Sequence, residues 1–189
     1  MILTEKFLRK EANENNKYNF SGFLENRKYD ENKNYDLFIS HSYMDKKLVE
    51  VLYGKFEEAG YSVYIDWKEE ELQNRENVSA NTANILKRRI NNCLGLAYIA
   101  TENITKSKWC PWELGYSDGK KNKAAIFPIL KSDSKEFKGL EYLGIYPYID
   151  YKINESGKYE FWVNDPDEKN KYTSLREWLK TGKLTEHNK

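Results

Sequence analysis

The chain has 189 residues, enough to bury the hydrophobic core of one domain of ordinary size. Its 31 Lys and Arg residues and 30 Asp and Glu residues leave a net charge of +1, without a long block of like charge, which argues against nucleic acid as a partner. Cys93 and Cys110 are too few and too far apart for a disulfide framework or a zinc site, which indicates a reducing, cytoplasmic environment. No apolar stretch can span a bilayer and no secretory signal is present, so we expect neither a membrane partner nor secretion.

Residues 1–33 are polar and rich in Asn, and we interpret them as an extension rather than a domain. Residues 34–182 are expected to form a single domain, followed by a disordered tail at 183–189. Within the extension, a short amphipathic helix is expected from the spacing of Ile2, Leu3, Phe7 and Leu8.

From residue 35 onward, short apolar runs alternate with longer stretches of helical periodicity, the pattern of a parallel sheet covered on both faces. Pro128 cannot donate a hydrogen bond to a neighbouring strand, so its strand should lie at an edge or end its pairing there. The sequence predicts an α/β fold with a flavodoxin-like open parallel five-stranded sheet and helices on both faces. Strands are expected at residues 35–39, 62–65, 93–100, 124–130 and 146–151. Helices are expected at residues 44–59, after an N-cap at Ser79, from a cap at Thr105 or Ser107 towards residue 119, and at 172–179.

In an open sheet of this kind the ligand crevice lies outside the carboxyl ends of the strands. The segments that reach this edge are 40–45, 66–78 and 101–113, and they contain nearly all the residues that could take part in chemistry. The sequence has no GxGxxG motif, no complete Walker loop, no HExxH motif and no GxSxG motif. We therefore expect neither a Rossmann dehydrogenase, a P-loop NTPase, a metalloenzyme nor a serine hydrolase.

Glu113 is the residue that we expect to be catalytic. It lies near the start of an expected helix, among Trp109, Trp112 and Tyr116, whose rings could exclude water and stack on a flat base. A carboxylate there could stabilise or trap the positive charge that develops on a ribose C1 when a glycosidic bond breaks. Glutamate is also favoured early in helices for capping, and the local sequence alone favours that simpler role.

The segment after the first strand offers groups that could bind the rest of a nucleotide, namely Ser40, His41, Ser42, Tyr43 and Asp45. Together with backbone N–H groups they could hold ribose hydroxyls or a pyrophosphate. Ser42 or Asp45 could instead cap the following helix. His41 fits a structural or ligand-orienting role better than that of a general base, because no nucleophile that needs one is evident.

The segment after the second strand begins with Asp66 and Trp67. Asp66 could bind ribose hydroxyls and Trp67 could stack on adenine or nicotinamide. Arg75, further along, could contact phosphate. The alternative is a solvated charged loop, which is the better interpretation of residues 68–71.

Several segments match a known domain in the same order, namely YDLFISHSYMDK, VYIDW, VSANTANILKRRI, SKWCPWELGYSDG and AIFPIL. Together they resemble a bacterial TIR (Toll/interleukin-1 receptor) domain over residues 35–129, and whether the resemblance continues to residue 179 stays open. The resemblance implies that Glu113 attacks the nicotinamide–ribose bond of NAD, with NAD as the substrate and no cofactor. It also implies that residues 66–77 form a mobile loop over the site that mediates assembly into oligomers. The chain departs from the family in two places: residues 74–77 replace the glycine that many TIR domains have in this loop, and residues 1–33 have no counterpart.

The resemblance leaves the product open. Attack of water on the ribose C1 gives linear ADP-ribose, whereas an adenine nitrogen or a ribose hydroxyl of the same molecule gives a cyclic isomer. A dry aromatic pocket formed by Trp67, Tyr98, Trp109 and Trp112 would favour cyclisation or transfer to another acceptor. As a short stand-alone chain, the protein resembles the sensor component of Thoeris-type anti-phage systems, whose product activates a separate effector protein.

Two other functions stay open. The fold could serve as a non-catalytic TIR module for protein–protein interaction, because a fold alone does not establish activity. A nucleoside deoxyribosyltransferase-like enzyme shares a related sheet and a glutamate nucleophile, but its substrates lack the pyrophosphate of NAD. A requirement for NAD over free nucleosides would separate the two enzymes.

Overall fold

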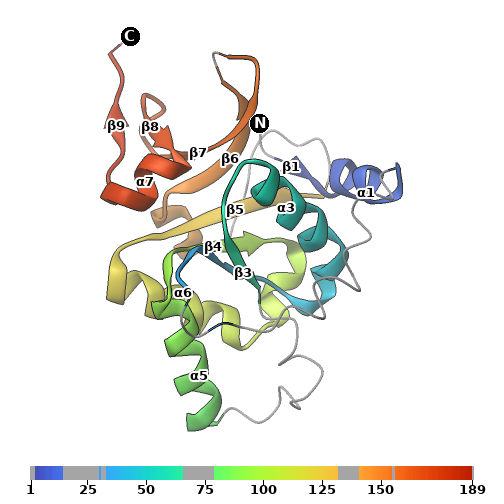
Figure 1. The fold of residues 1–189 in the computed structure, drawn as a ribbon, viewed down its shortest axis with the longest axis vertical. Helices are drawn as coiled ribbons and strands as arrows, with labels where there is room; N and C mark the ends of the chain where they lie inside the picture. The colour runs from blue at the N-terminus through green and yellow to red at the C-terminus, as the bar shows by residue number, and fades with distance from the viewer. Residues whose placement is uncertain are drawn as a thin grey trace.

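The computed structural model describes residues 3–14, 30, 33–65, 79–131, 141–154 and 156–188 of the chain. Within these residues a nine-stranded sheet has the order β3-β2-β4-β5-β6-β7-β8-β9, with β1 paired to β5 outside this path (Figure 1). The strands are β1 Leu3–Thr4, β2 Tyr35–Ser40, β3 Val63–Ile65, β4 Cys93–Ala100, β5 Ala124–Leu130, β6 Tyr148–Ile153, β7 Tyr159–Asn164, β8 Lys171–Ser174 and β9 Thr185–Glu186. The α-helices are α1 Glu5–Glu14, α3 Lys46–Glu58, α5 Ala80–Asn91, α6 Trp109–Lys121 and α7 Leu175–Thr181, and the short 3₁₀-helices are η2 Tyr43–Asp45, η3 Glu102–Lys106 and η4 Glu141–Ile145.

The expected α/β fold is confirmed. The five parallel strands are present as β2 to β6, and neighbours among them pair in parallel. The sheet is larger than expected, because β7, β8 and β9 continue it in antiparallel order beyond β6. The five-strand count therefore describes the parallel part of the sheet and not its full extent.

Alternate residues along the parallel strands face two separate hydrophobic cores. One core lies between the sheet and α1, α3 and α7, and it contains Leu37 and Phe127. The other lies between the sheet and α5 and α6, and it contains Phe38 and Tyr98. Figure 1 shows α1 beside α3, with α5 and α6 lying together away from them. Helices thus cover both faces, as the doubly apolar strands require.

The C-terminal part differs from the sequence prediction in two places. The helix expected at 172–179 begins only at Leu175, because residues 171–174 pair with β7 as strand β8. Ser174 caps this helix by accepting a hydrogen bond from the backbone N–H of Glu177 at 3.3 Å. The expected disordered tail at 183–189 is wrong for residues 185–187, because β9 pairs with β8 and the backbone N–H of His187 donates to the carbonyl of Asn170 at 2.8 Å.

The described part of the N-terminal segment packs into the domain. Helix α1 confirms the expected short helix for Phe7 and Leu8, whereas Leu3 lies in strand β1 and Ile2 lies outside the described residues. The side chains of Leu3 and Leu8 are fully buried. Strand β1 pairs in parallel with the carboxyl end of β5. Lys55 of α3 forms a 2.8 Å ion pair with Glu11 of α1. Because residues 15–29 lie outside the described residues, a domain boundary at residue 33 stays a prediction.

Pro128 lies where the pairing of two strands ends. It is opposite Ala100 in the last pair between β4 and β5, and beyond it Ile129 and Leu130 pair with β1. The expectation that pairing ends at Pro128 is confirmed on the β4 side. β5 itself lies inside the sheet, so the alternative of an edge strand is wrong.

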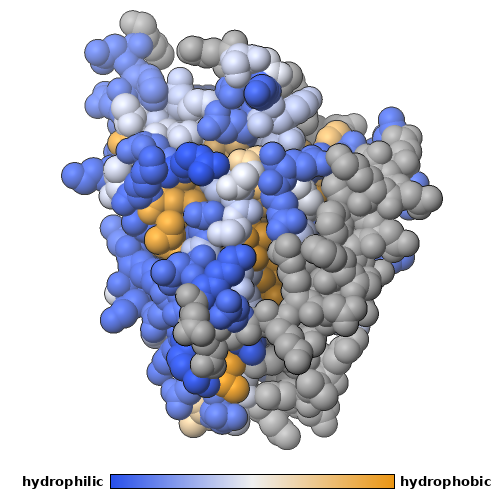
Figure 2. Space-filling model, in the orientation of Figure 1, coloured by the Kyte–Doolittle hydropathy of each residue, from blue (hydrophilic) through white to orange (hydrophobic). Residues whose placement is uncertain are grey.

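The surface in the view of Figure 2 is mainly hydrophilic where it is described, with small separate hydrophobic areas. Along the ranges that the structure covers, no helix is both long and apolar enough to cross a membrane. Among the described residues, the exposed large hydrophobic side chains are Tyr43 and Met44 of η2, Leu94 of β4, Ile145 of η4 and Tyr159 of β7.

Gly95 is expected to resist substitution, because β4 passes close to α7. An added Cβ would lie 2.8 Å from Cδ2 of Leu179 and 3.1 Å from the carbonyl oxygen of Lys123. We expect Gly95→Ala to lower the free energy of unfolding by about 1–3 kcal/mol in urea titrations. Gly119→Ala on α6 is the matched control, because the added Cβ meets no atom within 4 Å and alanine favours a helix by up to about 1 kcal/mol. Equal stability of the two variants would contradict the close approach.

Stability is expected to fall at alkaline pH because three buried groups resist losing their protons. Burial raises the pKa of the Cys93 thiol from 9.0 to about 12, and it raises the pKa of Tyr61 and of Tyr151 from 10.0 to about 12. Between these values the unfolded chain releases protons that the folded chain keeps, so the free energy of unfolding decreases as pH rises. Urea midpoints measured from pH 8 to pH 11 should fall, and Cys93→Ala should remove the part of the fall that begins near pH 9. A midpoint that stays constant over this range would refute the expectation.

Candidate active site

The two segments that the sequence singles out meet at the carboxyl edge of the sheet. Strands β2 and β4 lie side by side in parallel, with Ser40 opposite Tyr98 in their register. Their ends therefore bring residues 40–45 and 101–113 to the same place. Phe38 faces the core under α6, and since side chains alternate along a strand, Ser40 faces the same way.

Ser40 and Glu113 are in direct contact at this edge. The Ser40 hydroxyl donates a hydrogen bond of 2.6 Å to Oε2 of Glu113. The Glu113 residue is only 7% exposed, and it follows a first turn of α6 that contains no acidic residue. The interpretation of Glu113 as a capping glutamate at a helix start is therefore wrong. A buried carboxylate held by a hydroxyl from another element has a fixed direction, which a reacting group requires.

Helix α6 is attached to the loop after β2 at its first turn. Pro111 lies in that turn, where its missing N–H removes no helical hydrogen bond. The backbone N–H of Cys110 donates to Oγ of Ser107 at 3.2 Å, which confirms Ser107 as a capping side chain. The Cys110 thiol donates to the carbonyl oxygen of His41 at 3.1 Å. The backbone that follows Ser40 is thus tied to the helix that carries Glu113.

Most of the other predicted binding residues of the loop after β2 are internal. His41, Ser42 and Asp45 are buried, whereas Tyr43 is 50% exposed. Nδ1 of His41 lies 3.4 Å from the carbonyl oxygen of Ile39, which is compatible with the structural or ligand-orienting role expected for it. Neither Ser42 nor Asp45 caps a helix with its side chain, so that alternative is wrong for both.

The two tryptophans of α6 differ in their availability to a ligand. Trp109 is buried in the core under the helix, whereas Trp112 is partly exposed. Their ring centroids are 5.4 Å apart and their planes are nearly perpendicular, at 88°. Trp112 also stacks on Tyr116, with centroids 5.4 Å apart and planes at 8°. Trp112 is therefore the more accessible of the two indoles, with one face occupied by Tyr116, and the binding role expected for both tryptophans stays a prediction.

Three expected binding residues cannot be placed. Asp66, Trp67 and Arg75 lie outside the described residues, so their roles, and the role of the loop at 66–77, stay predictions. Conversely, the side chains of Thr101, Asn103 and Cys110 take part in the hydrogen bonds of this edge although the sequence predicts no such role for them. The sequence indicates that residues 101–113 reach the edge, but it gives no signal for which polar side chains turn inward.

A separate cavity of about 500 Å³ lies at the opposite edge, beside the carboxyl end of α6 and the amino end of β5. Asp118, Ile145, Asp165 and Trp178 are among its lining residues, and none of the predicted site residues is. Sheets of this type bind ligands at the other edge, so we place the candidate site at Ser40 and Glu113. Among the residues that the structure describes, no cluster of three or more His, Cys, Asp or Glu side chains could hold a metal ion.

The sequence also matches known proteins. The family model described as TIR domain matches residues 37–161. A protein of Bacillus cereus (strain MSX-D12), named "Probable 3' cyclic ADP-D-ribose synthase ThsB'", is 43% identical over 155 residues, which are 81% of this chain and 79% of that protein. A protein of Cytobacillus dafuensis, named "Putative cyclic ADP-D-ribose synthase TIR2", is 35% identical over 95 residues, which are 50% of this chain and 25% of that protein. The chain belongs to the TIR domain family.

Proposed function

We propose that the chain is an NAD-consuming enzyme that cleaves the nicotinamide–ribose bond and closes the remaining ADP-ribose into a cyclic product. The observation that carries this proposal is the Ser40–Glu113 hydrogen bond of 2.6 Å, buried at the ligand edge of a TIR domain. Both relatives are named as cyclic ADP-D-ribose synthases, which supports the same type of reaction here.

In the proposed reaction the Glu113 carboxylate acts on the ribose C1 of NAD. Nicotinamide is positively charged while it is bonded to the ribose and leaves as a neutral ring, so its departure needs no general acid. The carboxylate stabilises the positive charge on C1 or bonds to it. The Ser40 hydroxyl, which donates to Oε2, holds the carboxylate in its direction of attack. We propose no metal and no further cofactor for this reaction, in which NAD is the substrate.

Cyclisation requires that a group of the same molecule reaches C1 before water does. The relative from B. cereus is named for a 3' cyclic product, and we propose the same isomer for this chain. Tyr98 and Trp109 are buried and Trp112 is partly exposed, and in the proposed reaction these rings limit the access of water to Glu113.

The proposed setting is the bacterial cytoplasm, where the enzyme would be the signal-producing component of a Thoeris-type anti-phage system. Its product would activate a separate effector protein. Self-association through TIR surfaces would complete the pocket. Neither nucleic acid nor a membrane has a part in this scheme.

The test is to incubate the purified chain with NAD, to measure the nicotinamide released and to identify the nucleotide by mass spectrometry and chromatography against cyclic standards. We expect nicotinamide and a product lighter by one water than linear ADP-ribose. Linear ADP-ribose alone would refute cyclisation, and base exchange on free nucleosides without NAD turnover would indicate a deoxyribosyltransferase-like enzyme. Absence of NAD turnover, even at high protein concentration and with lysate from phage-infected cells, would indicate a non-catalytic interaction module.

A further inference from the structure

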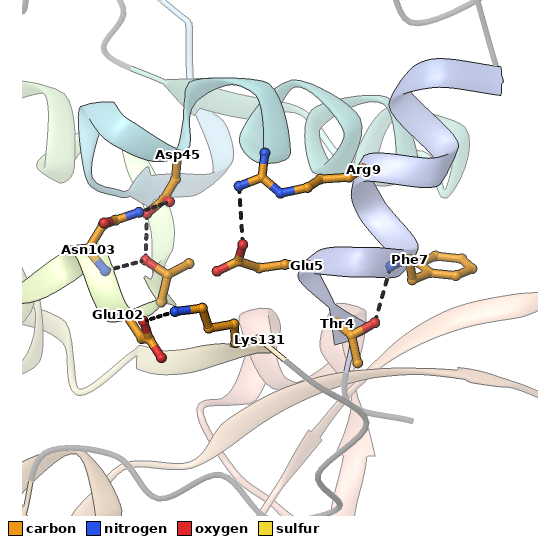
Figure 3. A network of polar contacts seen from close by, with 9 residues as sticks. Thr4, Glu5, Phe7, Arg9, Asp45, Glu102, Asn103 and Lys131 are labelled. Carbon is orange, nitrogen blue, oxygen red and sulfur yellow. Dashed lines mark hydrogen bonds and ion pairs between the residues drawn. The ribbon is translucent and has the colours of Figure 1, made fainter.

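Asp45 is buried, at 1% exposure, and both oxygens of its carboxylate accept hydrogen bonds from the segment after β4. The Thr101 hydroxyl donates to Oδ2 at 2.5 Å, and Nδ2 of Asn103 donates to Oδ1 at 2.7 Å. Figure 3 shows Asp45 and Asn103 pointing toward one another from separate elements. A buried carboxylate is costly unless its oxygens are bonded, so these two donors account for its presence.

The two donors belong to the segment that leads into the helix carrying Glu113. Thr101 is the N-cap of η3, and its Oγ1 also accepts a hydrogen bond from the backbone N–H of Asn103 at 3.1 Å. Only Ser107 and Lys108 separate η3 from α6. Asp45 therefore connects the start of α3 to the turn before α6 through buried hydrogen bonds, for which water cannot easily compete.

We infer that Asp45 is a positioning residue, which fixes η3 and the start of α6 so that Glu113 points at the substrate, and that it is not itself a ligand of the nucleotide. The activity part of this inference rests on the proposed function. Both carboxylate oxygens are committed to internal donors, and the residue is nearly inaccessible, so a ribose hydroxyl would have to displace an existing hydrogen bond. A misplacement of a reacting group by about 1 Å is enough to cost roughly 10²-fold in rate.

A second contact to η3 provides a matched control. Lys131, just after β5, forms a 2.8 Å ion pair with Glu102, and both side chains are more than 60% exposed, at 69% and 67%. Figure 3 shows this pair beside the Asp45 contacts. An exposed ion pair contributes little to structure, so Glu102→Gln is expected to leave kcat and KM unchanged. It alters the same η3 turn and the same number of charges as Asp45→Asn.

The experiment compares Asp45→Asn, Asn103→Asp and the double variant in steady-state NAD turnover. Asp45→Asn should lower kcat by about 10- to 100-fold and change KM for NAD by less than about 3-fold. Asn103→Asp should also lower kcat, because it places two carboxylates in contact. The double variant exchanges the two groups and restores a donor to a carboxylate, so kcat should recover to within about 5-fold of wild type. A raised KM with unchanged kcat in Asp45→Asn, or no recovery in the double variant, would overturn the inference.

Amide hydrogen exchange of residues 101–113 gives a readout that does not depend on activity. We expect faster exchange in Asp45→Asn, recovery in the double variant and no change in Glu102→Gln. If Asp45→Asn does not fold, Thr101→Val replaces it, because that change removes one donor and leaves the carboxylate hydrogen-bonded to Asn103.

Wild-type protein that releases no nicotinamide would refute the proposed function alone. Exchange that is the same in Asp45→Asn and wild type would refute the positioning role alone.

Discussion

Replacement of Glu113 by Gln is expected to reduce nicotinamide release from NAD by about 10³-fold or more, because it removes the charge that acts on the ribose C1 in the proposed reaction. The protein should remain folded. The amide oxygen of Gln can still accept the hydrogen bond that the Ser40 hydroxyl donates to Oε2, and the side-chain volume hardly changes. The loss should therefore fall on kcat, while the melting temperature stays within a few degrees of wild type.

Glu177→Gln is the matched control for Glu113→Gln. Glu177 lies in the first turn of α7, its side chain is 51% exposed, and it is remote from the Ser40–Glu113 pair. Its substitution removes the same charge and should leave turnover unchanged. Persistent NAD cleavage by Glu113→Gln at a wild-type rate would exclude Glu113 as the catalytic residue. An equal loss of NAD turnover in both variants would indicate a general effect of the removed charge or of protein preparation.

The pairing of Ser40 with Glu113 could be anticipated in part from sequence, because parallel neighbouring strands deliver their following loops to one edge of the sheet. The pattern of apolar runs located β2 and β4, and the alternation of side chains directs Ser40 toward α6. The hydrogen bond itself needed the structure, since 73 residues separate its partners. The positioning role inferred for Asp45 could not be predicted from the sequence either, because a carboxylate just before a helix has the pattern of a cap. Only the tertiary structure shows that its oxygens accept hydrogen bonds from Thr101 and Asn103 instead.

The sheet was also predictable only in its parallel part. Long apolar runs identify β4 and β5, which are buried on both faces. Strands β8 and β9 have four and two residues of mostly polar character and are assembled by pairing rather than by a local pattern. Strand β7, YEFWVN, alternates in burial only from Glu160 to Val163, because Tyr159 is exposed and Asn164 is buried against the alternation, so its local pattern is weaker than that of β4 or β5.

The largest effect on stability is expected for Phe161→Ala in β7. Phe161 is fully buried and stacks on Phe56 of α3, with centroids 4.1 Å apart and planes at 17°. It also meets Tyr151 at 4.8 Å and Phe127 at 6.1 Å between centroids. Truncating a core phenylalanine leaves a cavity and costs about 3–5 kcal/mol. For a chain of this size that corresponds to a fall in melting temperature of roughly 6–20 °C.

Tyr159→Ala separates the effect of burial from the effect of shortening an aromatic side chain in the same strand. Tyr159 is 54% exposed and stacks on Tyr151 at 4.9 Å, so its loss should cost about 1 kcal/mol or less. The comparison tests whether the antiparallel strands share one core with the parallel sheet, because Phe161 touches α3 and β5 rather than only its hairpin. If they do, Phe161→Ala unfolds in one cooperative transition at lower urea, and the site at Ser40 and Glu113 is lost in that same transition. Two separate transitions, or a cost equal to that of Tyr159→Ala, would instead make β7 to β9 an independent addition to the domain.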